Sequence, residues 1–394
     1  MNAMNYDVII VGGGIHGAGV AQAVAAAGNS VLLVEKSEIG SGTSSKSSKL
    51  IHGGLRYLEG FQFSLVKSCL SERTILLRNA PDIVKLAPFY IPIYKSSKRR
   101  PWKIFLGLSL YNFLSGFKSP FKKIPKSEWS KLGSINVKNL QAVYQYFDAQ
   151  TDDVVLTKAV VKSAQSLGAD ILTNAVMVSS EINKNEVHVS VEAGGTLKQY
   201  QCAVLVKAAG ASVNEVLKSC KPTQLELPVD LVQGTHIVLN APAKEGVYYL
   251  ESMSDHRAVF AIPWKGKTLV GTTETKIDNS EAQSPIPHQS EIDYLLTVYN
   301  DYFPGEGKTL DDVIESFAGL RVLPKEEGAI FSRNRDTVLL TDSRDNPRVL
   351  SIYGGKLTAY RATAEKVLAA ISMSLPLPAK DKMTSMTTKD LPLN

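Results

Sequence analysis

The chain has 394 residues, of which 44% are hydrophobic and 21% charged, and its formal net charge is +6. The length favours two lobes, the composition is typical of a globular protein, and the mild positive charge favours anionic substrates, cofactors or membrane surfaces over nucleic acid. The three cysteines form no C-x-x-C pair and no run reaches roughly 20 apolar residues, so we expect no metal site, disulfide framework or membrane-spanning helix.

The first predicted elements form a strand–turn–helix unit. The apolar, β-branched run at 8–11 predicts a buried parallel strand, and the alanine-rich segment 18–27 predicts a helix that ends at Gly28. Gly12, Gly14 and Gly17 lie between them with the spacing G-x-G-x-x-G. This order is typical of a dinucleotide-binding turn, in which the glycines allow a tight turn, close approach of a pyrophosphate and close helix packing.

A second strand at 31–34 ends in Glu35, whose carboxylate can accept both ribose hydroxyls of an adenosine and would repel a 2′-phosphate. The alternative to dinucleotide binding is a glycine-rich loop that serves packing alone. Because no second complete fingerprint follows, we expect one nucleotide to be held, and FAD is favoured by two later segments. The strand at 203–211 runs into small residues, and the strand and helix at 349–368 are joined by Gly354 and Gly355.

The stretch 42–60, GTSSKSSKLIHGGLRYLEG, follows the second strand. The hydroxyl groups of Thr43, Ser44, Ser45 and Ser48 are predicted to bind the FAD pyrophosphate and ribityl chain. Gly53 and Gly54 are predicted to let the backbone pass under the flavin ring. Arg56 and Tyr57 would then reach the substrate.

The rest of the chain alternates between two kinds of pattern. Segments that mix strand and helix predict a discontinuous FAD-binding domain, and strand-rich segments with a turn at Lys265 and Gly266 predict an antiparallel substrate domain. The predicted limits are 1–85, 145–225 and 335–375 for the first domain, 86–144 and 226–334 for the second, and 376–394 for a tail.

Residues 94–123 combine basic side chains with an apolar, aromatic segment too short to span a bilayer. We interpret the segment as a candidate for a membrane interface, with Trp102 and Phe113 among the headgroups and lysines on anionic lipid. A core helix that follows a basic loop is the alternative.

Six blocks occur in chain order: VGGGIHGAGVA, TSSKSSKLIHGGLRYLE, FDAQTDD, IPWKGKTLVGTTE, GLRVL and SIYGGKLTAYR. In these blocks the chain resembles the FAD-dependent glycerol-3-phosphate dehydrogenases of the respiratory type over essentially its whole length. The resemblance implies an α/β fold, with a Rossmann-like FAD-binding domain of the glutathione-reductase and D-amino-acid-oxidase type interleaved with an antiparallel-sheet substrate domain. Typical members continue into a C-terminal helical domain, so we expect a short form without it.

The resemblance also implies site residues. His236, Arg321 and Lys356 would be catalytic, with His236 taking the alcohol proton, and Arg56, Tyr57, Thr273 and Arg335 would bind substrate, since the planar arginine fork suits phosphate. The alternative for each arginine and for Lys356 is a salt bridge. For His236 it is a hydrogen-bonded core histidine, and for Thr273 a strand-end turn. The expected FAD-binding residues are Gly12, Gly14, Ile15, Gly17, Glu35, Lys36, Thr43, Ser44, Ser45, Ser48, Leu50, His52, Gly53, Gly54, Ala209, Gly210, Gly354, Gly355, Lys356, Leu357 and Thr358.

The implied reaction is oxidation of sn-glycerol 3-phosphate to dihydroxyacetone phosphate by hydride transfer to flavin N5, with electrons passed to a quinone or another acceptor. The alternatives are an FAD-dependent oxidase of a different hydroxy or amino acid and an inactive flavin-binding relative. We expect a phosphorylated polyol as substrate, no nucleic-acid partner, and a place in the cytoplasm or peripherally at the inner face of the membrane.

Overall fold

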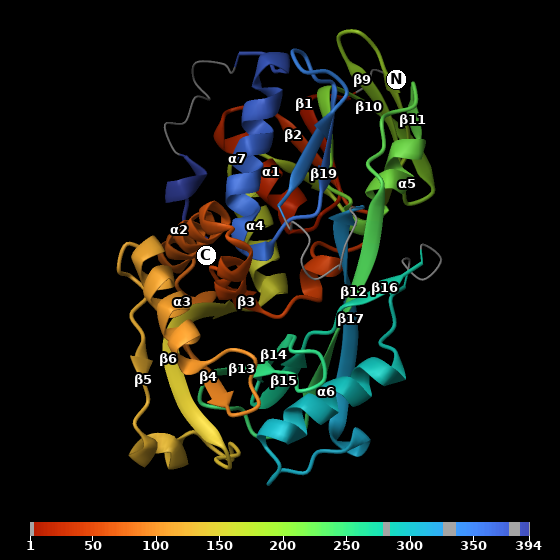
Figure 1. The fold of residues 1–394 in the computed structure, drawn as a ribbon. Coiled ribbons are helices and arrows are strands. Elements are labelled where there is room, and N and C mark those ends of the chain that lie inside the picture. The colour runs from red at the N-terminus through yellow and green to blue at the C-terminus, as the bar shows by residue number, and fades with distance from the viewer. Residues whose placement is uncertain (1–3, 279–283, 326–335, 378–386, 394) are drawn as a thin grey trace.

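The computed structural model describes residues 4–278, 284–325, 336–377 and 387–393. Its strands form two sheets, one in each lobe of the molecule, and helices pack around both (Figure 1). The α/β fold predicted from the sequence is confirmed.

The first sheet is built around β1 (Met4–Val11), which lies parallel to β2 (Val31–Val34) on one side and to β10 (Thr196–Lys207) on the other. Residues 8–11 are buried, because a strand that is apolar on both faces requires a covering layer on each side. The other strands described in this sheet are β7 (Asp170–Leu172), β8 (Ala175–Ile182), β9 (Val187–Ala193), β11 (Cys220–Lys221), β18 (Val338–Thr341) and β19 (Val349–Tyr353).

Helix α1 (Ile15–Ala26) follows β1 after the glycine-rich turn. It begins three residues before the predicted start, and Gly28, with φ of 85°, lies just beyond its end as predicted. Small residues allow α4 (Asp153–Ser166) and α7 (Tyr360–Ile371) to pack closely on α1. A Cβ on Gly19 would lie 2.7 Å from the Tyr360 ring, so this close approach depends on glycine. A short helix, α5 (Val213–Lys218), follows β10.

Most strand pairs described in the second sheet are antiparallel, although β13 pairs in parallel with β4. Its strands are β3 (Leu50–Ile51), β4 (Val84–Tyr94), β5 (Lys122–Lys123), β6 (Leu140–Thr151), β12 (Val229–Leu239), β13 (Val247–Glu251), β14 (Ala258–Trp264), β15 (Lys267–Gly271), β16 (Thr275–Ile277) and β17 (Val313–Pro324). The predicted turn at Lys265 and Gly266 is confirmed, because both residues have positive φ between β14 and β15.

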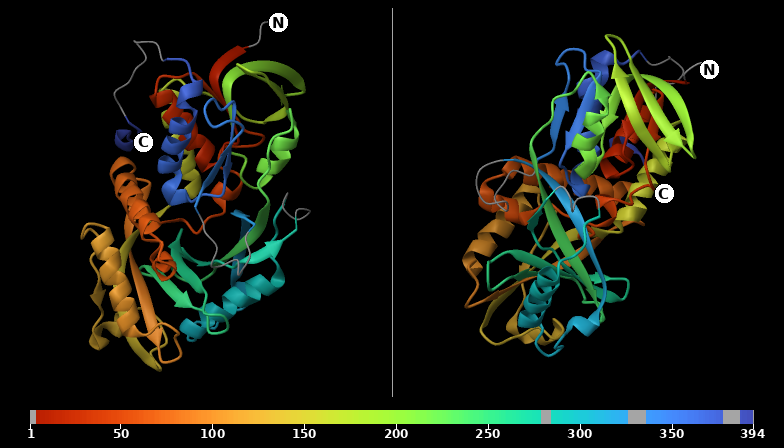
Figure 2. Two further views of the ribbon diagram at one scale, coloured as in Figure 1. Left: turned by 45° about the horizontal axis from the view of Figure 1, so that its top comes forward. Right: turned by 90° about the vertical axis from the view of Figure 1, so that its right-hand side faces the viewer.

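Helices cover the second sheet. Helix α6 (Gln289–Tyr302) lies along its outer side, where Leu295 and Tyr299 join the core formed with β12 and β13 (Figure 2). Helices α2 (Phe63–Asn79) and α3 (Pro101–Leu114) pack beside β4 and β6. The last described residues, 387–393, pack against α2, and the Leu393 N–H donates to the Asn79 carbonyl.

The two sheets draw on interleaved parts of the chain. Strands of the first come from 4–34, 170–221 and 338–353, and strands of the second come from 50–151 and 229–324. The domain limits given above stay a prediction, but this interleaving brings residues from distant segments to the region where the lobes meet.

Candidate active site

A cavity of about 1070 Å³ is lined by residues of both sheets and of the loops between them. Small-molecule pockets are commonly roughly 300–1,000 Å³, so this volume suits a large cofactor with a substrate beside it. The lining residues come from the ends of β1 and β2, from the stretch 41–57, from β12 and β17, and from 354–358.

At one end of the cavity the glycine-rich turn leaves no room for side chains. Gly12 has φ of 110°, and a Cβ there would lie 2.5 Å from the Ala208 carbonyl oxygen. A Cβ on Gly17 would collide with the Gly12 carbonyl. The Ser44 hydroxyl accepts a hydrogen bond of 2.9 Å from the Ile15 N–H, which ties the serine-rich loop to the start of α1. The backbone can therefore approach a bound pyrophosphate at a helix N-terminus.

Glu35 lies at the end of β2 and lines the same part of the cavity. Its carboxylate accepts hydrogen bonds from the N–H groups of Gly13, at 2.5 Å, and Ser37, at 2.8 Å. These two bonds orient the side chain, and each carboxylate oxygen retains a lone pair for a ribose hydroxyl.

The turn after β19 closes the cavity from the other side. Gly354 and Gly355 have φ of 71° and 114°, and a Cβ on Gly355 would collide with the His16 ring. Among the described residues, neither the buried Lys356 Nζ nor His16 Nδ1 has a hydrogen-bond partner, although Nζ lies 4.0 Å from the centre of the Tyr57 ring. A buried amine without a hydrogen-bonding partner is costly, so this site fits a ligand with polar or anionic groups, as FAD has.

His236 lies on β12, only 2% exposed, with its ring stacked on Phe317 at 5.1 Å. The Ser48 hydroxyl lies 2.9 Å from His236 Nε2. Burial, together with the charges of Arg321 and Lys49, lowers the pKa of His236 to about 3. The imidazole is therefore neutral at physiological pH and can exchange a proton with a group in the cavity.

Two arginines approach one carboxylate beside His236. Arg56, in the 3₁₀ helix η2 (Leu55–Gly60), lies 3.7 Å from Glu274, and Arg321, on β17, lies 3.8 Å from it. Arg321 also donates to the Thr273 carbonyl and the Thr272 hydroxyl, each at 3.3 Å. The guanidinium groups thus converge on one part of the cavity, where they can bind a phosphate.

The structure brings most of the predicted site residues together. The cavity is lined by Gly12, Gly14, Ile15, Glu35, Lys36, Thr43, Ser44, Ser48, Leu50, His52, Gly54, Arg56, Tyr57, Ala209, Gly210, His236, Arg321, Gly354, Gly355, Lys356, Leu357 and Thr358. Their roles in binding and catalysis stay predictions.

Four predicted residues do not line the cavity, and Arg335 lies outside the described residues. Gly17 packs on Gly12, and Gly53 lies beside a tyrosine on α3. The Ser45 hydroxyl turns back to the carbonyls of Ser41 and Gly42. The Thr273 hydroxyl donates to Glu291 at 2.6 Å, and it is the neighbouring Thr272 that faces the cavity.

Several lining residues were missed by sequence reasoning. His16 lies inside the G-x-G-x-x-G turn, and Glu274 follows directly after VGTT, so their places in the motifs could have indicated them. Lys46 lies between Ser45 and Ser48 in the stretch 42–60, so its place there could also have indicated it. Tyr249 and Arg257 carry no comparable local signal, because tertiary packing brings them to the cavity.

A family model described as FAD dependent oxidoreductase matches residues 7–361. A glycerol-3-phosphate dehydrogenase of Pseudomonas aeruginosa is 36% identical, over 97% of this chain and 76% of that protein. A D-erythritol 1-phosphate dehydrogenase of Brucella abortus is 34% identical, over 98% of this chain and 76% of that protein. The crystal structure of a glycerol-3-phosphate dehydrogenase from Bacillus halodurans in complex with FAD matches with a TM-score of 0.74 and 27% identity, over 96% of this chain and 67% of that one.

Proposed function

The chain belongs to the FAD-dependent oxidoreductases, among the glycerol-3-phosphate dehydrogenases, and we propose that it oxidises sn-glycerol 3-phosphate to dihydroxyacetone phosphate. The observation that carries the substrate assignment is the convergence of Arg56 and Arg321 beside the neutral His236, within one cavity that the buried Nζ of Lys356 also borders. A phosphorylated alcohol needs cations for its phosphate and a neutral base near its hydroxyl, and this end of the cavity offers both.

The cofactor is FAD, which when bound supplies a flavin ring that accepts hydride at N5. The protein would hold its pyrophosphate with the backbone of Gly12 and Gly14 and with the N-terminus of α1, and its ribose with Glu35. The N–H groups of the turn at Gly354 and Gly355 would donate hydrogen bonds to the polar edge of the ring.

His236 would take the proton of the substrate hydroxyl, directly or through Ser48, whose hydroxyl is already within hydrogen-bond distance. The positive charge of Arg321 contributes to the low pKa of this histidine. A substrate phosphate paired with Arg321 would offset part of that charge and raise the pKa. The imidazole would therefore become a stronger base when a phosphorylated substrate is present, which favours phosphorylated over plain alcohols.

A longer polyol phosphate is a second candidate substrate. The relative from Brucella abortus carries the name D-erythritol 1-phosphate dehydrogenase, and its identity to this chain is close to that of the Pseudomonas relative.

Anaerobic reduction of the bound flavin tests the proposal. We expect glycerol 3-phosphate to bleach the flavin absorbance of the wild type and plain glycerol to leave it unchanged. Erythritol 1-phosphate, assayed in parallel, separates the two candidate substrates. In Arg321→Ala the preference for the phosphorylated alcohol should fall, and the phosphate role is wrong if that preference is retained.

We also propose a peripheral membrane contact through α3, with a quinone as electron acceptor. No helix in the described part of the chain is long and apolar enough to cross a bilayer. Helix α3 and the turn after it nevertheless expose a group of apolar side chains beside basic residues: Trp102, Phe105, Leu106, Phe113 and Phe117. Such a surface suits the headgroup region of an anionic bilayer.

Flotation with anionic vesicles tests this contact. The wild type should float, and Phe113→Ser should float less, because Phe113 is 61% exposed and the ring it contacts, Phe117, is exposed as well. A wild type that stays at the bottom of the gradient would remove the membrane proposal. Oxygen and peroxide assays with and without a quinone analogue would then distinguish a dehydrogenase from an oxidase.

A further inference from the structure

The hydroxyl of Tyr111, on the buried face of α3, lies under the stretch that carries the substrate arginine. It accepts a hydrogen bond of 2.8 Å from the Gly53 N–H and donates one of 2.6 Å to Asp148 Oδ2. Arg73 Nη1 donates to the other Asp148 oxygen at 2.5 Å. The side chains of Tyr111, Asp148 and Arg73 are at most 2% exposed, so water cannot replace any of these partners.

The direction of the hydrogen bonds is fixed by charge. Burial and the neighbouring Asp148 raise the pKa of Tyr111 well above its usual value, so the phenol keeps its proton. The O–H then donates to the carboxylate, and a lone pair remains for the backbone N–H of Gly53. Removing this hydroxyl would take one partner each from the buried Gly53 N–H and from Asp148 Oδ2, while Arg73 still binds the other oxygen of Asp148. Taking a partner from a buried polar group costs more than the hydrogen bond itself.

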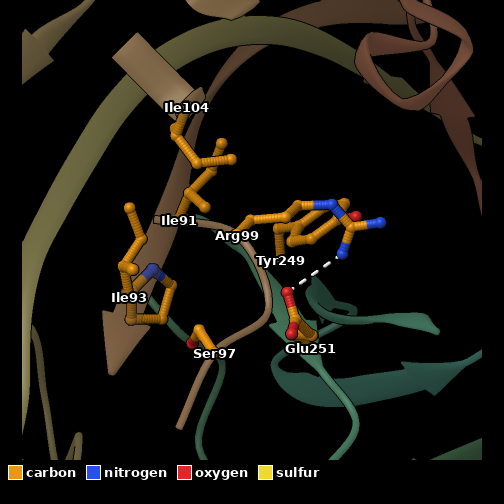
Figure 3. Close-up of a pocket in the computed structure, with 8 residues that line it drawn as sticks. Ile91, Ile93, Ser97, Arg99, Ile104, Tyr249 and Glu251 are labelled. Carbon is orange, nitrogen blue, oxygen red and sulfur yellow. Dashed lines mark hydrogen bonds and ion pairs between the residues drawn. The ribbon is translucent and has the colours of Figure 1, made fainter. Parts of the chain in front are cut away.

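A second contact holds the far end of the same stretch. Arg99, just before α3, donates to both oxygens of Glu59, at 2.5 and 2.8 Å, and to Glu251 at 2.9 Å. Figure 3 shows Arg99 reaching Glu251 beside Tyr249, which also lines the main cavity. Arg99 therefore joins the end of η2 to the end of β13.

Arg56 and Tyr57 lie between these two contacts. None of the six residues of η2 is fully buried, and Leu55, Tyr57 and Leu58 pack only in part against the core of this lobe. Polar contacts add to this packing at both ends of the stretch, at the N–H of Gly53 and at the carboxylate of Glu59.

We propose that Tyr111 and Arg99 are positioning residues that hold residues 53–59, and with them Arg56 and Tyr57, at the substrate end of the cavity. The proposal rests on the proposed function, since it assigns to this stretch the binding of a phosphorylated alcohol. The two residues act from the side of the stretch that faces α3, so they set substrate affinity without touching substrate.

Tyr111→Phe tests the proposal in the flavin-loaded protein, because it removes one oxygen atom and keeps the ring. The matched control is Tyr248→Phe, since Tyr248 is also buried in this lobe and its hydroxyl donates to the Leu132 carbonyl at 2.8 Å, away from the stretch. In anaerobic flavin reduction we expect the half-saturating concentration of glycerol 3-phosphate to rise about tenfold in Tyr111→Phe, which corresponds to about 1.4 kcal/mol. The limiting rate should change less than about threefold, because a purely binding loss leaves it unaltered.

Hydrogen exchange gives a readout that needs no substrate. Amides of residues 53–59 should exchange about tenfold faster in Tyr111→Phe, because local opening is easier when an anchoring bond is lost. They should remain at the wild-type rate in Tyr248→Phe. Arg99→Gln provides a second variant if Tyr111→Phe does not fold, and the same loss of affinity and of protection is expected.

The outcomes separate the two proposals. If glycerol 3-phosphate leaves the wild-type flavin oxidised, the proposed function fails, and exchange at 53–59 still tests the positioning role. If the wild type is reduced normally and Tyr111→Phe matches Tyr248→Phe in affinity and exchange, the positioning role is wrong. A fall in limiting rate at unchanged affinity would also overturn it.

Discussion

Lowering the pH from about 7 to about 5 should reduce the free energy of unfolding by about 2 kcal/mol through His236 alone. The folded-state pKa of this histidine is lowered to about 3, from an ordinary value of 6.5, chiefly by burial. Between these two values the unfolded chain binds a proton that the folded chain does not. Stability therefore rises with pH in this window; the contribution is complete above pH 6.5 and is lost as the pH falls below it.

The magnitude follows from the width of the window. Each pH unit below 6.5 lowers the free energy of unfolding by about 1.36 kcal/mol, so the interval down to pH 5 lowers it by about 2 kcal/mol. Carboxylates contribute little above pH 5, because most of them titrate in the unfolded chain near pH 4. His236 also stacks on Phe317 and contacts Ser48, so the substitution itself will cost some stability at every pH.

Urea titrations of flavin-free protein at several pH values measure the effect. His236→Gln places an amide near the position of Nε2. Between pH 7 and pH 5 its free energy of unfolding should fall by about 2 kcal/mol less than that of the wild type. His188→Gln serves as the control, because His188 lies on β9 with its side chain 42% exposed. The reasoning is refuted if His236→Gln retains the pH dependence of the wild type, or if His188→Gln loses it.

Three further substitutions test other parts of the structure. Gly17→Ala sets a Cβ against the Gly12 carbonyl, so the purified protein should carry far less flavin; a wild-type ratio of flavin to protein absorbance would contradict this. Asp153→Asn leaves Lys49 buried without its charge partner, so the free energy of unfolding in urea titration should fall by about 3–5 kcal/mol. A fall of less than about 1 kcal/mol would indicate an exposed pair. Arg321→Lys keeps the charge but loses the planar fork, so the half-saturating concentration of glycerol 3-phosphate should rise roughly tenfold, and an unchanged value would argue against a bidentate phosphate contact.

The predictions from the sequence were most accurate at positions whose conformation depends on residues next to them in the chain. Gly12 needs glycine for its φ of 110°, and Gly17 needs it because a Cβ would meet the Gly12 carbonyl. Glu35 follows from the end of the strand, so these three positions could be predicted from the spacing. The same applies to the turn at Lys265 and Gly266, where two positive φ values are required.

Prediction was weaker where side-chain direction or distant packing decides the outcome. Thr273 follows two residues after the end of β15, where strand alternation no longer indicates direction, and its hydroxyl turns to Glu291. The contact of Tyr111 with Gly53 joins residues 58 positions apart, and no local pattern records it. Such contacts depend on the assembled sheets, and a single sequence carries no signal for them.

The cavity has a consequence for how much folded protein a cell can maintain. Its lining runs from Val11 to Thr358, so it exists only when both sheets have formed, and FAD then binds the native chain and not the unfolded one. A ligand with this preference adds about 2.7 kcal/mol of stability at 100 times its dissociation constant. Flavin supply should therefore govern the abundance of this protein as well as its activity, since chains made when FAD is scarce would spend more time unfolded and be degraded sooner.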